Sequence, residues 1–348
     1  MGSITGAATV IGLKKATTWG TATAIGSGDK VEVESLNQAE NAEELTANPI
    51  GAGTSMATES RRGATSPTVE IETLMGYDNS ALVAVGQFFG TDTVNEEPGG
   101  SGDYLHSFMF NETRNQAFVT AAFQAASAVA GSIEFPSCVT TRVQITAENP
   151  PNYTRLGLSL LANEQELASA TNTYTSLNSA TVANSQRIVL QPDDQFLINA
   201  QGGGALSGSD KLNITSIDIA LEYDQGFVAE IKGSLGNGTP VAVGDPPFQG
   251  TVTIRLKELS DLTYFTAAQA GTEYKAMLDI QDDTSPYRMR VYFPRLKIVE
   301  DPEYNLTTTA TNEHVITFKC LAAASNPTGM VDTTPFIVIK NEQSGAYI

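Results

Sequence analysis

Few side chains in this sequence could carry out catalysis or bind a metal ion. It contains two histidines, His106 and His314, and two cysteines, Cys138 and Cys320. No HExxH motif and no other histidine pair with zinc-ligand spacing occurs, and CxxC, GxSxG, GxGxxG and GK[ST] motifs are also absent from the sequence. We therefore predict no catalytic residue, no cofactor and no metal site. Each histidine is interpreted as an ordinary surface or hydrogen-bonded side chain.

Two pairs of adjacent carboxylates, Asp193-Asp194 and Asp282-Asp283, are the clearest acidic clusters. Neither follows the pattern of an EF-hand loop, so we interpret both as solvated turns. An enzyme would need a polar catalytic constellation, and the sequence shows none. We predict that the protein is not an enzyme.

The charge balance narrows the classes of partner. The 348 residues include 20 basic and 39 acidic side chains, for a net charge of −19. Such an acidic surface repels phosphate, which argues against basic-patch binding of nucleic acid and against adhesion to an anionic membrane. The two cysteines suit a reducing compartment as small buried residues. The first residues have neither a basic segment nor a long apolar core, so we expect no signal peptide.

The elements that must position any functional side chain are mainly β-strands. Around Asp29–Leu36, Val31 and Val33 alternate with Glu32 and Glu34, as in a strand that buries one face. The same alternation recurs at residues 68–72, 212–215 and 251–257. Further strands are expected at residues 105–110, 116–123, 133–146, 156–161, 291–299, 315–322 and 336–340.

Two stretches have the spacing of short helices. In residues 78–90, apolar side chains recur every three or four positions, with Asp78 as a candidate N-cap and Gly90 as a candidate C-cap. Residues 260–271 repeat this design, starting at Ser260 and ending at Gly271.

The two halves of the chain repeat these elements in one order. Asp29-Lys30-Val31 resembles Asp210-Lys211-Leu212, and Ile133-Glu134-Phe135-Pro136 resembles Val291-Tyr292-Phe293-Pro294. Chance similarity of strands and turns is the alternative, but the shared order favours an internal duplication. We predict a first domain at residues 1–171 with a long polar loop at 39–66, a linker or extra strand at 172–208, and a second domain at 209–348 with a C-terminal extension.

The order of segments near the amino terminus resembles a known family. The segments are Thr17-Thr18-Trp19-Gly20-Thr21, the acidic alternating strand, a long loop that ends in Arg61-Arg62-Gly63, the strand at 68–72, and Gly76-Tyr77-Asp78 before the helix. This arrangement resembles the tail tube protein, or major tail protein, of long-tailed, non-contractile bacteriophages. The resemblance is clearest over residues 10–90 and is one of arrangement, without a signature residue.

The resemblance implies a fold and a role. The expected fold is mainly β, with two tandem β-sandwich or barrel domains, each flanked by one short helix. Tandem members of the family form trimeric rings that imitate six-fold symmetry, and the rings stack into a tube in the virion. The implied partners are other copies of the chain and tail proteins such as the tape measure and the terminator. Double-stranded DNA would pass through the lumen without specific binding, no membrane is involved, and the chain would be made in the host cytoplasm.

A second class of protein stays open at this point. A β-sandwich surface, decoration or adhesin module would share the β pattern, the Thr and Gly content and the acidity. Adhesins usually carry a secretion signal or an aromatic-lined binding face, and this sequence shows neither.

The charged faces of the alternating strands are the candidate assembly or lumen surface. They carry Glu32, Glu34, Glu70 and Glu72 in the first half, and Arg255 and Lys257 in the second. Either these faces line the pore, or they meet between subunits as complementary charge pairs. We favour the second interpretation, because a basic patch in the lumen would retard DNA. Arg61 and Arg62, in the long polar loop, are candidate contacts between stacked rings.

Overall fold

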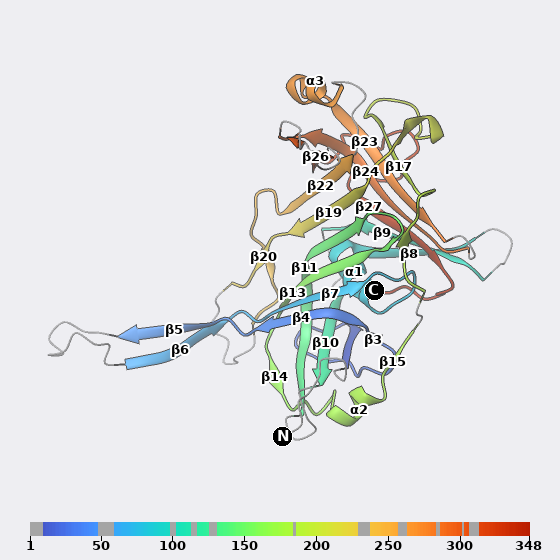
Figure 1. The fold of residues 1–348 in the computed structure, drawn as a ribbon. Helices are drawn as coiled ribbons and strands as arrows, with labels where there is room; N and C mark the ends of the chain where they lie inside the picture. Colours follow the sequence, from blue (N-terminus) through green and yellow to red (C-terminus); the bar gives the residue numbers. More distant parts are fainter. Residues whose placement is uncertain are drawn as a thin grey trace.

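The computed structural model shows a mainly β protein in which the strands of both halves form one continuous body (Figure 1). It describes residues 10–47, 59–97, 102–112, 117–124, 131–183, 186–228, 237–256, 263–282, 286–300, 303–305 and 313–348.

The first half contains an antiparallel sheet with a helix packed on it. Hydrogen-bonded neighbours follow one another in the order β4 (Val33–Ala39), β7 (Thr68–Leu74), β13 (Arg155–Ala162), β11 (Ser132–Glu148), β10 (Phe118–Gln124), β1 (Ile11–Ala16) and β3 (Lys30–Val31). Helix α1 (Ala81–Phe89) contacts β11, β10 and β1. Its Gln87 side chain accepts a hydrogen bond from the Thr140 amide (2.6 Å), next to a β-bulge in β11.

The second half repeats this strand order. The neighbours are β19 (Ser216–Tyr223), β22 (Phe248–Leu256), β26 (Glu313–Cys320), β24 (Arg288–Ile298), β23 (Glu273–Gln281), β17 (Gln195–Ala200) and β18 (Lys211–Leu212). Helix α3 (Thr263–Ala270) contacts β24, as α1 contacts β11. A further short strand, β25 (Glu303–Asn305), continues along β26 beyond the end of β24.

The register of the two halves also agrees. Phe135 lies opposite Ala121 and Phe293 lies opposite Ala276, and each pair stands beside a β-bulge. A proline follows each phenylalanine, and because proline has no amide hydrogen it interrupts the ladder at the same place in both halves. The two Phe-Pro pairs in the sequence therefore occupy equivalent positions.

The helix ends follow local backbone requirements. The N-cap position of α1 is Ser80, whose side chain makes no capping hydrogen bond, and Asn79 Oδ1 accepts from the Ala81 amide at 3.0 Å. The carboxylate of Asp78, the predicted cap, instead accepts a hydrogen bond from the hydroxyl of Tyr347 (2.8 Å). Gly90 and Gly271 have φ angles of 86° and 65° and end the two helices, as the sequence predicts. Ser260 lies outside the described residues.

Long-range strand pairing places two segments whose position the sequence left open. Residues 172–208, predicted as a linker or extra strand, contain β17, which pairs with β18 and β23 as the counterpart of β1. In the C-terminal extension, β27 (Phe336–Asn341) pairs with β24 and with β9 (Tyr104–Phe110). The counterpart of β27 in the first half is β14 (Glu166–Leu167), which pairs with β11.

The described ends of the segment predicted as a long polar loop, residues 39–66, contain two paired strands. Strands β5 (Ala42–Ala47) and β6 (Glu59–Thr65) pair antiparallel and project far from the body (Figure 1). Backbone hydrogen bonds between the two strands form this arm without the apolar alternation that marks a half-buried strand.

The remaining elements connect and cover the two sheets. Strand β8 (Gly90–Glu96) pairs with β9 in a hairpin inserted between α1 and β10. The smaller elements are β2 (Ser27–Gly28), β12 (Asn152–Tyr153), α2 (Tyr174–Asn178), β15 (Thr181–Val182), β16 (Val189–Leu190), η3 (Gly208–Asp210), β20 (Gln225–Gly226) and β21 (Val241–Ala242).

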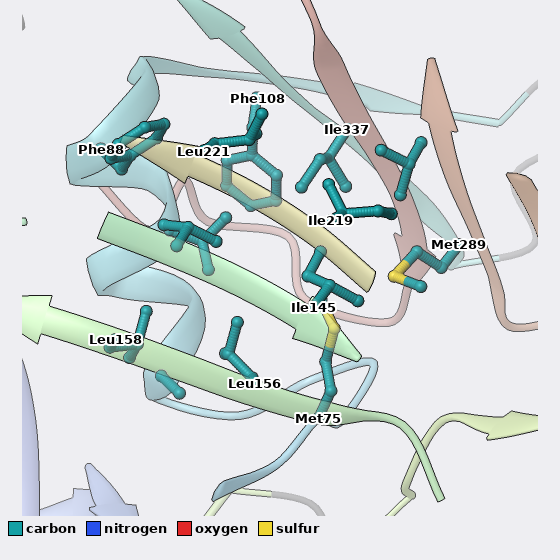
Figure 2. Packing of buried hydrophobic residues seen from close by; sticks show 14 of the residues in the cluster. Met75, Phe88, Phe108, Ile145, Leu156, Leu158, Ile219, Leu221, Met289 and Ile337 are labelled. Atoms are coloured by element: carbon teal, nitrogen blue, oxygen red, sulfur yellow. The ribbon is translucent and has the colours of Figure 1, made fainter. Parts of the chain in front are cut away.

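One hydrophobic core runs through both halves. Strand β11 pairs with β19 from Arg142–Glu222 to Glu148–Ser216, which joins the two sheets edge to edge. Figure 2 shows Ile145 of β11 and Ile219 of β19 in the same cluster as Phe88 of α1 and Ile337 of β27. The joint therefore buries apolar surface as well as forming backbone hydrogen bonds.

Candidate assembly and channel surfaces

The strands on either side of the joint present one continuous polar face. In β13, Leu156, Leu158 and Leu160 are buried, and Arg155 and Ser159, on the other face of the strand, are not. The same alternation holds in β7, β11, β19 and β22 because successive strand side chains point to opposite faces. We call the outward side of β4, β7, β13, β11, β19, β22 and β26 the polar face.

The carboxylates predicted from the sequence lie on this side of the sheet. Glu70 and Glu72 are exposed on β7, where they accept hydrogen bonds from Asn37 and Ser35 of β4, each at 3.3 Å. Since β4 and β13 cover both edges of β7, these glutamates stand on a sheet face and not at a free edge.

Glu34 and Glu32 have cationic partners within the chain. Glu34 accepts a hydrogen bond from Arg155 Nε at 2.8 Å, and Glu32 forms an ion pair with Arg187. Two of the four carboxylates predicted from the sequence as candidates for contacts between subunits are thus paired with arginines of the same chain.

The two halves place opposite charges at one equivalent position. Glu72 lies between Ser35 and Gly157 on neighbouring strands, and Arg255 lies between Ser216 and Val315 in the corresponding register of the second half. Arg255 is exposed on the polar face. Lys257 lies outside the described residues.

The cations near the joint are matched by carboxylates. Arg142 Nε lies 3.3 Å from Glu222 Oε1 across the joint. Asp218 accepts hydrogen bonds from Gln144 Nε2 (2.9 Å) and Thr146 Oγ1 (3.1 Å). Among the described residues of its seven strands, the charged side chains of the polar face are Glu34, Glu70, Glu72, Glu148, Asp218, Glu222, Arg142, Arg155, Arg255 and Lys319. The face is therefore mixed in sign, with a small excess of acidic side chains.

Arg61 and Arg62 belong to the projecting β5–β6 arm. Their backbones pair with Leu45 and Glu44 of β5. The arm is thus an ordered extension at its base, and it carries the two candidate inter-ring residues away from the body (Figure 1).

The histidines and cysteines are buried within the fold. Cys138 and Cys320 are free thiols, and burial raises the pKa of Cys320 to about 12, so it is not a reactive thiolate near neutral pH. His314 is buried on β26. In the part of the chain that the structure describes, no group of three or more His, Cys, Asp or Glu side chains could hold a metal ion.

His106 belongs to a polar cluster that fastens the C-terminal tail, which the sequence did not reveal. Its Nδ1 lies 3.1 Å from Asp92 Oδ2, and its Nε2 lies 2.8 Å from the carbonyl oxygen of Gln343. The amide of Tyr347 donates to Asp92 at 2.7 Å. Burial lowers the pKa of His106, but the hydrogen bond and charge of Asp92 outweigh it, and the net pKa lies above its usual value.

The comparison with known families agrees with this arrangement of sheets and surfaces. The family model for phage tail tube proteins matches residues 6–318, which is most of the chain. The chain belongs to the phage tail tube protein family. It is accordingly a structural component of a bacteriophage tail, and this membership favours a structural role over an enzymatic one.

No curated protein matches the chain. The family match favours a tail tube protein over the surface, decoration or adhesin module that the sequence left open. Among the residues that the structure places, no helix has the length and apolar character needed to cross a bilayer.

Proposed function

We propose that three copies of this tail tube protein close into a ring, and that stacked rings form the conduit through which the phage genome leaves the particle. The observation that carries the proposal is the repeated strand order of the two halves, joined edge to edge through β11 and β19. Two repeats per chain give six similar units in a ring of three chains. A heterologous contact that repeats around a rotation axis closes such a ring.

The repeated order supports two tandem tail-tube-like domains. In this division the second domain starts at β17, because β17 supplies the strand that β1 supplies to the first. Residues 172–190 then connect the two domains. They also pack on the first one, since Asn172 accepts a hydrogen bond from the Ile25 amide at 2.7 Å.

We place the polar face toward the lumen. Lining the pore requires a solvated surface that runs continuously across neighbouring repeats, and the polar face crosses the joint without interruption. DNA slides through best where no uncompensated cationic patch binds its phosphates. The carboxylate partners of Arg142 and Arg155 provide this compensation.

The β5–β6 arm is proposed to contact the next ring in the stack, with Arg61 and Arg62 at the interface. A projecting hairpin gains buried surface when it docks on a neighbour. At the two ends of the tube, the tape measure and terminator proteins would take the place of a neighbouring ring. The chain would be made in the host cytoplasm before assembly into the tail.

Negative-stain microscopy and native mass measurement of the purified full-length chain test the proposal. We expect annular particles or hollow tubes, and a ring mass three times the chain mass of 36.8 kDa. A ring of six chains, or a chain that stays monomeric under all conditions, would contradict it.

A further inference from the structure

We infer that neighbouring chains in the ring join by pairing strand β25 of one copy with the outer edge of β4 in the next copy. The register of this contact is inferred to be that of the internal β11–β19 joint. The inference rests on the proposed ring and adds which edges meet and which residues face each other. Its partner is a second copy of this chain.

The internal joint shows how such an edge is filled. Strand β10 covers one edge of β11 only as far as Cys138, so the following residues of β11 present free backbone groups on that side. Strand β19 occupies this edge, with Ile145 opposite Ile219 and Thr146 opposite Asp218. On its other edge, the same part of β11 pairs with β13.

Strand β25 is the equivalent of that part of β11. Leu158 of β13 and Ile316 of β26 occupy matching positions, because they lie opposite Ile71 and Ile254 of equivalent strands. Counting from these two residues, the partners of β13 from Gly157 to Arg155 are Gln144, Ile145 and Thr146. The corresponding partners of β26 are Glu303, Tyr304 and Asn305.

Strand β4 is the equivalent of β19. Leu36 lies opposite Ile71 and Ile217 lies opposite Ile254, so the two strands run in matching register. The outer edge of β19 is covered by β11. Within the described residues, no strand pairs with the outer edge of β4 or of β25.

The sequence of β4 does not protect this edge. Proteins usually guard an exposed edge strand with proline, charged side chains or a β-bulge, and the residues of β4 that would pair, Asn37–Ala39, contain none of these, since Glu34 and the bulge of β4 lie between Val33 and Ser35. Among the described residues, each copy therefore has an unpaired outer edge on β4, and it also has an unpaired edge on β25, which is equivalent to the filled edge of β11. These two edges complement each other. Transfer of the internal register places Glu303 opposite Ala39, Tyr304 opposite Gln38 and Asn305 opposite Asn37.

Paired cysteines test the register in the full-length chain. The variant Asn37→Cys with Asn305→Cys should form disulfides between copies under mild oxidation, giving covalent dimers and trimers on a non-reducing gel. The two native cysteines are buried and stay in place. Each single-cysteine variant serves as a control for non-specific cross-linking.

The internal joint provides a matched control. Thr146 and Asp218 occupy the positions in the internal joint that Asn305 and Asn37 occupy in the inferred contact. The variant Thr146→Cys with Asp218→Cys should therefore close a disulfide within one chain, and its band should stay at the mass of a single chain on the non-reducing gel. Ser35→Cys with Asn305→Cys shifts the register by two residues and should cross-link poorly, because diagonal neighbours lie roughly 7–8 Å apart.

The outcomes separate this inference from the proposed function. Rings that cross-link through 37–305 support it. Rings that cross-link only through 35–305, or through neither pair while 146–218 closes, overturn the inferred contact and leave the ring proposal standing. A wild-type chain that never forms rings overturns both.

Hydrogen exchange on the unmodified chain gives a second measurement that needs no substitution. Amides in β4 and β25 should exchange more slowly in assembled rings than in monomers, because pairing protects edge amides from solvent. The amides of the internal joint should show little change. Unchanged exchange in both β4 and β25 would contradict the inferred pairing.

Discussion

At the scale of single residues, the turn that ends α1 depends on glycine. Gly90 has a φ of 86°, where a Cβ atom costs about 1 kcal/mol. We expect Gly90→Ala to lower the free energy of unfolding by about that amount in urea titrations. Gly204→Ala is the control, since no atom lies within 4 Å of the added Cβ and the residue is exposed. Equal effects of the two substitutions would refute the argument from backbone strain.

The His106 cluster makes a testable contribution to pH dependence. Because the pKa of His106 is raised in the folded state, its stabilisation is complete below the unfolded value of about 6.5. That stabilisation is lost as the pH rises through the folded-state pKa. The charged and titratable groups around the imidazole are Asp92, Asp78 and Tyr347.

We therefore expect the unfolding free energy of the wild-type chain to fall with rising pH in this window, relative to that of His106→Gln. Asp92→Asn should remove the same pH dependence, because it takes away the carboxylate that favours the imidazolium. Urea titrations at several pH values measure the difference between wild type and each variant. Parallel pH profiles for all three chains would show that His106 does not change its charge on unfolding.

At the scale of elements, local pattern predicted those strands that bury one face and expose the other. The alternation of Val69 and Ile71 with Glu70 and Glu72 identified β7 and its exposed side. Strand β17 was not located within the predicted linker or extra strand at residues 172–208, because its apolar residues form an uninterrupted run within a Ser- and Gly-rich region. The β5–β6 arm was missed because the sequences of its two strands lack the apolar alternation of a half-buried strand.

The surroundings of the candidate site could not be predicted from local sequence. The sequence placed Glu70 and Glu72 on the exposed face of a strand, but it did not show that β4 and β13 cover both edges of that strand. Strand order is a property of long-range pairing and leaves no mark in the alternation of one segment.

The arm yields a prediction at this scale. We expect Arg61→Glu with Arg62→Glu to leave ring mass unchanged and to shorten or abolish tubes in negative-stain images. The reason is that the β5–β6 arm projects from the body and the substitutions reverse two charges at the proposed contact between rings. Lys15→Glu with Lys211→Glu, on β1 and β18 within the body, is the control for net charge. If the arm variant forms normal tubes, Arg61 and Arg62 do not take part in the contact between rings.

At the scale of the whole molecule, the repeated strand order allows one chain to carry unlike charges at equivalent positions. A ring of identical single domains would repeat the same charge six times. Here Glu72 and Arg255 occupy the same place in the two repeats, so the proposed three-chain ring would alternate an acidic and a basic side chain at this position. Such alternation would offset part of the acidic charge of the proposed lumen while both repeats retain the same strand order.

The lumen assignment predicts the phenotype of charge reversal on β7. Glu70→Lys with Glu72→Lys should leave ring and tube assembly intact, because both edges of β7 are occupied within the chain. Phage particles built from this variant should release DNA more slowly, since added cations in the lumen attract phosphate. Asp193→Lys with Glu342→Lys makes the same change in net charge at exposed positions outside the polar face and should release DNA normally. If the β7 variant fails to form rings while the control assembles normally, Glu70 and Glu72 would be assigned to the subunit interface and not to the lumen.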